Sequence, residues 1–163
     1  MNIRNQTEMS RIKILVIGER NIGKTTLCKK IHGMNNLAES FPTLGIDHQM
    51  SETNGTTFDT FDVPIDELKI LANIKTSFNC VLLCFDLSRM ETIKRLKSLM
   101  SLLISNYFPE AKYALVGLKF DILASLCPVE MKKSLSKAQK HSKKLNIPFH
   151  QISTLTNNIQ DII

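Results

Sequence analysis

The sequence lacks several features that would define other classes of protein. It contains no tryptophan, and only 6% of its 163 residues are aromatic. The first ten residues are polar, so we expect no secretory signal peptide, and no apolar run approaches the roughly 20 residues of a membrane span. The four cysteines form no C-x-x-C pair, so we expect buried, reduced thiols in a cytosolic protein and neither a disulfide framework nor a zinc site.

What remains is the composition of one globular domain. Hydrophobic residues make up 43% of the chain, and the net charge of +6 favours acidic partners. We expect a flexible extension over residues 1–10 and one domain over residues 11–163. No cysteine lies near the last residues, so we expect no prenyl anchor on the sequence as given.

The stretch from Gly18 to Thr25 reads Gly-Glu-Arg-Asn-Ile-Gly-Lys-Thr. It follows an apolar run and precedes a helical pattern, the strand–loop–helix setting of a phosphate-binding P-loop, although a chance glycine-rich turn is the alternative. Lys24 is expected to reach the β- and γ-phosphates, and the Thr25 hydroxyl to bind Mg²⁺. The predicted phosphate-binding residues are Gly18, Arg20, Asn21, Ile22, Gly23, Lys24, Thr25 and Thr26.

Strand-like and helical patterns alternate along the rest of the chain. Strands are predicted over residues 12–17, 47–52, 56–62, 80–85, 114–118 and 149–153, and helices over 24–32, 66–76, 89–107, 129–145 and from 157 onward. The Asn54-Gly55 pair predicts a tight hairpin, which makes the second and third strands antiparallel. The fold class is therefore α/β: a P-loop NTPase with a six-stranded, mostly parallel sheet, one antiparallel strand and helices on both faces.

Two residues downstream suit the same metal ion. The hydroxyl of Thr43, which precedes the second strand, can bind Mg²⁺ when a γ-phosphate is present. Asp62, at the end of the third strand, can hold a Mg²⁺-bound water. Thr25, Thr43 and Asp62 are thus the candidate metal ligands.

Over essentially its whole length the chain resembles the Ras superfamily of small GTPases, and in detail it is most similar to the fungal septation and mitotic-exit group. The resemblance rests on Thr43-Leu44-Gly45-Ile46, Phe85-Asp86-Leu87-Ser88, Gly117-Leu118-Lys119-Phe120-Asp121-Ile122-Leu123, Cys127-Pro128-Val129-Glu130 and Ile152-Ser153-Thr154. It implies binding of GTP or GDP with Mg²⁺, with the guanine base held by Leu118, Lys119, Asp121, Ser153 and Thr154. It also implies a monomer without a lipid anchor, an effector in a kinase cascade, GTPase-activating or exchange proteins, and a cytoplasmic location with recruitment to spindle poles.

The chain departs from the family pattern at the second switch. Asp62-Val63-Pro64-Ile65 replaces D-x-x-G, and Asp66 takes the place of the glutamine that orients the attacking water. An ionised aspartate cannot donate a hydrogen bond, so we expect slow or absent hydrolysis and assign no catalytic residue. Arg20, where the family has a small residue, is either an obstructing or solvent-pointing side chain, the interpretation we prefer, or a built-in arginine finger.

The base-binding loop departs as well. Leu118 replaces the family asparagine and offers the purine no polar atom. Asp121 remains, and its carboxylate would prefer guanine over adenine. The alternative is that Asp121 is only a helix N-cap.

The helix predicted over residues 129–145 is rich in lysine. It contains a single acid, Glu130, and six lysines: Lys132, Lys133, Lys137, Lys140, Lys143 and Lys144. They form either an ordinary solvated face or a surface for an acidic partner or anionic membrane. Nucleic acid is not expected, because no aromatic residues interleave with the lysines.

These patterns predict a guanine-nucleotide-binding switch with weak hydrolysis. Alternatives are a pseudo-GTPase scaffold that ignores nucleotide, a Rab-like trafficking GTPase and, least favoured, a P-loop kinase.

Overall fold

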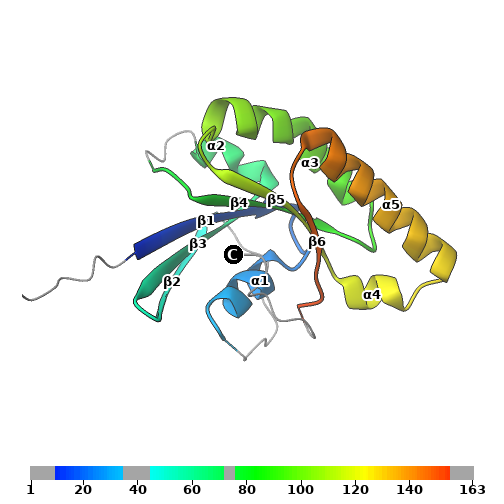
Figure 1. Cartoon of the computed structure of the whole chain (residues 1–163), viewed down its shortest axis with the longest axis horizontal. Helices are drawn as coiled ribbons and strands as arrows, with labels where there is room; N and C mark the ends of the chain where they lie inside the picture. Colours follow the sequence, from blue (N-terminus) through cyan, green and yellow to red (C-terminus); the bar gives the residue numbers. More distant parts are fainter. Residues whose placement is uncertain (1–9, 35–44, 72–75, 155–163) are drawn as a thin grey trace, which may run out of the picture.

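The computed structural model describes residues 10–34, 45–71 and 76–154, which form a sheet with helices on both faces (Figure 1). The strands are β1 (Ser10–Gly18), β2 (Asp47–Thr53), β3 (Thr56–Pro64), β4 (Cys80–Asp86), β5 (Lys112–Leu118) and β6 (Phe149–Gln151). Their order across the sheet is β2-β3-β1-β4-β5-β6, and only the β2–β3 pair is antiparallel. The predicted sheet is confirmed.

The hairpin between β2 and β3 turns at the predicted dipeptide. Asn54 and Gly55 have φ angles of 52° and 75°, the left-handed conformation that a two-residue hairpin turn requires at both central positions. The flanking Thr53 and Thr56 are paired, which fixes the register of the hairpin.

The helices are α1 (Lys24–Ile31), α2 (Leu68–Leu71), α3 (Glu91–Leu102), α4 (Phe120–Ala124) and α5 (Pro128–Leu145). A 3-10 turn over Ile65–Glu67 leads into α2, and a π-helical turn over Leu103–Tyr107 ends α3. Helix α1 covers one face of the sheet, and α2, α3 and α5 cover the other (Figure 1). Within the described ranges, no helix is both long and apolar enough to cross a bilayer.

Alternating side chains of the central strands build a core on each face. Leu15 and Ile17 of β1 pack in the cluster that lies under α2, α3 and α5. Ile14 and Val16 point the opposite way, into the smaller cluster that includes Leu27 of α1. Successive side chains of a strand point to opposite faces of the sheet, and helices cover both faces here. Every position of the buried part of β1 is therefore apolar, which explains the continuous apolar run in the sequence.

Several predicted helix boundaries need correction. The helix expected over 66–76 does not reach Thr76, which is irregular and accepts a hydrogen bond from Lys13 Nζ at 2.7 Å. The helix expected from residue 89 begins at Glu91, and the Arg89 side chain before it donates a hydrogen bond to Asp86. Helix α4 was not predicted, and the helix expected from residue 157 lies outside the described residues.

The predicted domain boundary at residues 10 and 11 lies close to the start of the first strand. Strand β1 begins at Ser10, and residues 1–9 of the expected extension lie outside the described residues.

Candidate functional site

The loop between β1 and α1 has the backbone that a phosphate cradle needs. A Cβ atom on Gly18 would lie 2.3 Å from the carbonyl oxygen of Cys84 in β4, so only glycine fits there. Gly23 has a φ of +101°, which favours glycine, and its carbonyl accepts a bond from Leu27 N–H. The first turn of α1 therefore directs its free N–H groups at the mouth of the loop.

Lys24, Thr25 and Asp62 meet beneath this loop. Lys24 is buried, with its Nζ 2.8 Å from the Glu19 carbonyl oxygen and 3.6 Å from Asp62 Oδ1. The Thr25 hydroxyl donates to Asp62 Oδ2 at 2.5 Å. The structure thus brings two of the three predicted Mg²⁺ ligands together.

This donor set fits Mg²⁺, which prefers hydroxyl and carboxylate oxygens. Bound there, Mg²⁺ would supply positive charge to the β- and γ-phosphates, beside the charge of Lys24. The third predicted ligand, Thr43, lies outside the described residues.

The rest of the loop divides between anchoring and exposed residues. The Ile22 side chain is fully buried in the apolar cluster under α1, so only its backbone is available to a phosphate. Asn21 is exposed at a φ of 59°, and Thr26 is half-buried in the first turn of α1. The side chain of Ile22 therefore holds the loop against the sheet.

The acidic residues at the position of the second switch form ion pairs with two arginines. Arg20 donates to Glu67 at 2.9 Å, and its Nε lies 4.0 Å from Asp66. Asp66 also accepts a bond from Arg95 of α3 at 3.1 Å, and Arg95 lies 3.6 Å from Glu19. The Arg20 side chain is 30% exposed and links the P-loop to the 3-10 turn, so it does not simply point into solvent. Its obstructing and arginine-finger interpretations stay predictions.

The residue in the position of the switch glycine is anchored in the core. The Ile65 side chain is buried in the cluster that contains Leu68 and Leu71. Pro64 before it has an extended ψ of 143° and starts the 3-10 turn. The sequence predicted a backbone at Ile65 that is less flexible than glycine would allow. In the structure, the packing of the Ile65 side chain restrains that backbone further.

The predicted base-binding residues meet at the ends of β5 and β6. Ser153 donates its hydroxyl proton to Asp121 Oδ1 at 2.8 Å, across 32 residues of sequence. Thr154 is buried next to it. Lys119, not Asp121, is the N-cap of α4, so the N-cap interpretation of Asp121 is wrong.

A carboxylate that the sequence analysis did not assign connects this loop to the P-loop. Asp86 accepts bonds from Lys119 and Arg89, both at 3.0 Å. Lys119 Nζ lies 3.0 Å from the Asn21 carbonyl oxygen, and Arg89 reaches the same oxygen at 3.5 Å. The position of Asp86 at the end of a buried strand was the available signal.

The charge of Asp86 is stabilised by these contacts. Burial alone raises the pKa of Asp86, but hydrogen bonds from Ser88, Lys119 and Arg89 outweigh that effect and lower the pKa below its ordinary value. Asp86 is therefore an anion that holds two cations near the P-loop.

Leu118 belongs to the core and not to a polar contact surface. Its side chain is fully buried in the cluster with Ile22 and Val116. Its Cδ1 lies 3.9 Å from where a Cβ of Gly23 would be, so it fills the space directly beneath the P-loop. It supports the loop through packing, in a position where the family asparagine supplies a hydrogen bond.

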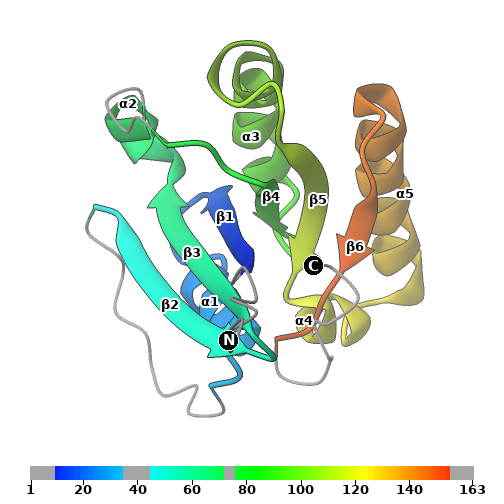
Figure 2. The same cartoon turned by 60° about the vertical axis from the view of Figure 1, so that its left-hand side comes forward.

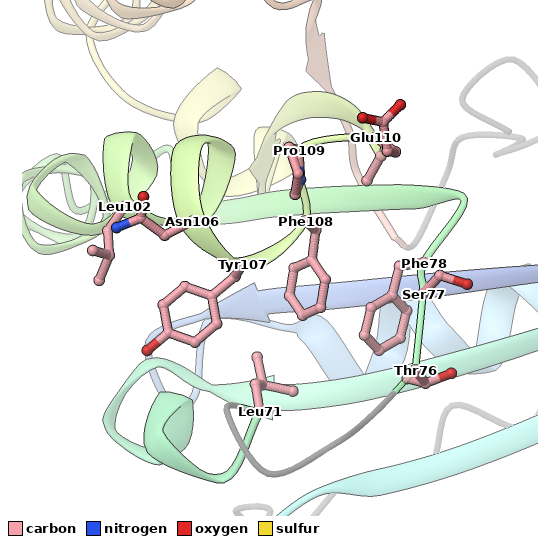
Figure 3. Close-up of a pocket in the computed structure, with 11 residues that line it drawn as sticks. Leu71, Thr76, Ser77, Phe78, Leu102, Asn106, Tyr107, Phe108, Pro109 and Glu110 are labelled. Carbon is pink, nitrogen blue, oxygen red and sulfur yellow. The ribbon is translucent and has the colours of Figure 1, made fainter.

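Two further features lie apart from this site. All four cysteines are free, but Cys80 is only half-buried and Cys127 is exposed, which corrects the expectation of buried thiols at these two positions. A pocket of about 730 Å³ lies at the opposite ends of the strands, where Leu71, Phe78, Tyr107 and Phe108 converge (Figure 3). None of the predicted nucleotide-binding residues lines it.

In the described ranges, no group of three or more His, Cys, Asp or Glu side chains could hold a metal ion.

Comparison with known proteins yields one family. The model for the Ras family matches residues 13–163, which is nearly the whole chain. No curated protein matches the sequence.

Proposed function

The chain belongs to the Ras family and is a small GTPase-like nucleotide-binding switch, and on this premise we propose that it binds guanine nucleotides but hydrolyses GTP slowly or not at all. Family members generally bind GTP and GDP with Mg²⁺ and interact with effectors, GTPase-activating proteins and exchange factors. Lys24, Thr25 and Asp62 form the phosphate and metal end, and Asp121, Lys119 and Ser153 form the base end.

The observation that carries the slow-hydrolysis proposal is the carboxylate of Asp66 beside Arg20 of the P-loop. Asp66 stands where the family has its water-orienting glutamine, and Arg95 and Arg20 lie 3.1 and 4.0 Å from its carboxylate. An ionised carboxylate repels phosphate and cannot donate a hydrogen bond to it.

The ion pairs themselves are weak constraints. The Asp66 and Arg95 side chains are 50% and 60% exposed, so this pair contributes about 0–1 kcal/mol. The chemistry of the side chain, more than the strength of its pairing, is therefore what limits hydrolysis. Ile65 adds a second obstacle, because its burial fixes the backbone beside Asp66.

We also propose that the switch acts in septation and mitotic exit. The similarity of residues 117–123 and 127–130 to the septation group supports this role. It carries with it an effector in a kinase cascade, a cytoplasmic location and recruitment to spindle poles. A Rab-like trafficking role is the alternative within the same family.

A second candidate is a scaffold that does not switch with nucleotide. It is favoured by the burial of Ile65 and Leu118, which replace two nucleotide-contacting residues of the family by core side chains. Such a protein would keep the fold and the protein-binding surface without a bound GTP or GDP.

Nucleotide analysis separates the two candidates. We expect about one guanine nucleotide per purified chain, and weaker GDP and GTP binding by Lys24→Ala, since a charged hydrogen bond contributes about 1.5–3 kcal/mol. Lys112→Ala, which removes an exposed lysine at the start of β5, is the matched control. Calorimetry that gives equal affinity in wild type and Lys24→Ala, or a purified protein without nucleotide, would favour the scaffold.

A further inference from the structure

Helix α5 presents a basic face that the nucleotide site does not use. Its 18 residues span about 27 Å, and 3.6 residues per turn place its six lysines within an arc of about 140°. All six are exposed: Lys132, Lys133, Lys137, Lys140, Lys143 and Lys144. The opposite side of the helix, with Ala138 buried, packs on the core that faces α3. Figure 2 shows α5 at the outer end of the sheet, beside β6.

The positive field of this face extends beyond α5. The pKa of His141 lies below its ordinary value, first because of partial burial and then because of the charges of Lys97 and Lys144. Lys97 belongs to α3, so two adjacent helices contribute positive charge to one surface. The acid in the first turn, Glu130, lies at the edge of the lysine arc and offsets only one charge.

An exposed apolar side chain lies within the same arc. Val129 is 73% exposed, the largest value among the exposed large hydrophobic residues of the described ranges. Its direction on the helix falls between those of Lys132 and Lys133. Leu126 and Ile122, just before it in the sequence, are 39% and 44% exposed.

We propose that α5 is a peripheral membrane-binding face, which docks on anionic lipid headgroups and inserts Val129 at the interface. Lysines are compact, hydrated charges suited to a fluid layer of anions, and each contributes attraction near an acidic lipid surface. An apolar side chain that enters the headgroup region adds buried apolar area to the electrostatic attraction of the lysines, and Val129 is placed to do so.

An acidic protein is the less favoured occupant of this face. Protein interfaces are enriched in Arg, Tyr, Trp and Phe and depleted in Lys, because their centres need rigid side chains that tolerate burial. The exposed residues of α5 include no arginine and no aromatic residue; they are Lys, Ser, Gln, Val, Pro and one acid, Glu130. This face therefore carries charge but lacks the arginine and aromatic side chains that contribute most of the binding energy at protein interfaces.

The test uses the full chain with phosphatidylcholine vesicles that contain or lack phosphatidylserine. We expect sedimentation with the anionic vesicles only, and loss of binding as salt approaches ~1 M, where the Debye length is about 3 Å. Lys133→Gln/Lys140→Gln should weaken binding roughly thirtyfold, equivalent to about 2 kcal/mol. The control is Lys69→Gln/Lys112→Gln, which removes two exposed lysines elsewhere and should change binding little.

A fluorophore on Cys127 tests insertion. Cys127 is exposed and precedes Val129 by two residues, whereas Cys28 and Cys84 are buried and burial raises the pKa of the half-buried Cys80 thiol. An environment-sensitive label should shift to the blue on anionic vesicles, and less in Val129→Ser.

Three results would overturn the proposal. The first is equal binding to neutral and anionic vesicles, and the second is an equal loss of vesicle binding in the two double variants. The third is binding to soluble polyglutamate with no binding to vesicles. The last result would assign the face to an acidic protein.

Discussion

The two ends of the nucleotide site have diverged from the family pattern in different ways. At the base end, Leu118 has lost a polar contact, yet Asp121 is still held by Ser153 and Lys119 still reaches the P-loop. At the phosphate end, the metal and phosphate residues meet, but the second switch is tied into ion pairs with Arg20 and Arg95. Under the proposed function, binding and turnover therefore depend on separate groups of residues, and we expect that one can weaken while the other persists.

The largest expected effect comes from breaking the base end. Asp121→Asn should weaken GDP binding by about 10–100-fold, since a hydrogen bond to a charged group contributes about 1.5–3 kcal/mol, and should shift preference toward xanthine nucleotides. Competition calorimetry with GDP and XDP measures both effects. Asp66→Asn, which removes a carboxylate at the other end, is the control and should leave base preference unchanged. An Asp121→Asn protein with unaltered affinity and preference would remove the guanine assignment.

Repair of the phosphate end should have a smaller effect, on rate and not on binding. Arg20→Gly/Asp66→Gln frees the second switch from its arginine and restores an amide that can orient water. We expect a single-turnover GTP hydrolysis rate about tenfold higher, a fraction of the roughly 100-fold or more that a well-placed proton-transfer group supplies. Adding Ile65→Gly should raise it further at a cost of at least about 2 kcal/mol in stability, because Ile65 is buried. A fast wild-type rate, lost in Arg20→Gly, would instead make Arg20 the catalytic arginine.

The smallest expected effect is that of Leu118→Asn, which should strengthen nucleotide binding but lower the stability of the fold. The new amide should tighten GDP binding by at most about tenfold, the equivalent of 0.5–1.5 kcal/mol for a neutral hydrogen bond. The same change removes a fully buried leucine from the core and should lower the free energy of unfolding by about 2 kcal/mol or more. Calorimetry and thermal unfolding in the absence of nucleotide separate the two effects. Leu118→Met keeps the core filled and should change neither, so a gain in affinity there would exclude the hydrogen-bond explanation.

The sequence predicted those parts of the molecule that short-range patterns encode. All six strands were found because their side chains alternate or run apolar, and Asn54-Gly55 fixed the antiparallel pair. The P-loop was found because its glycines, lysine and threonine have a fixed spacing. The meeting of Asp121 and Ser153 followed from family resemblance.

The features that were missed depend on tertiary contacts. Arg20 pairs with Glu67 and Arg95 with Asp66 across 47 and 29 residues, and a sequence does not say which of its many charges will meet. Helix α4 is only five residues long and starts from Lys119 at a φ of 59°, so it has neither periodicity nor a typical cap. The core position of Leu118 could not be separated from a solvent-facing loop position by sequence alone.

Asp86 makes the guanine end and the phosphate end a single mechanical unit. Its two cationic partners, Lys119 and Arg89, both reach the carbonyl of Asn21, so the carboxylate and the two cations together connect the base loop to the phosphate loop. Because the pKa of Asp86 is lowered, its contribution to stability is complete above the unfolded-state value and is lost only as pH falls through the still lower folded-state value. The tether thus does not respond to pH changes near neutrality. Under the proposed function, we therefore expect release of nucleotide from one loop to shift the other loop at any pH within the physiological range.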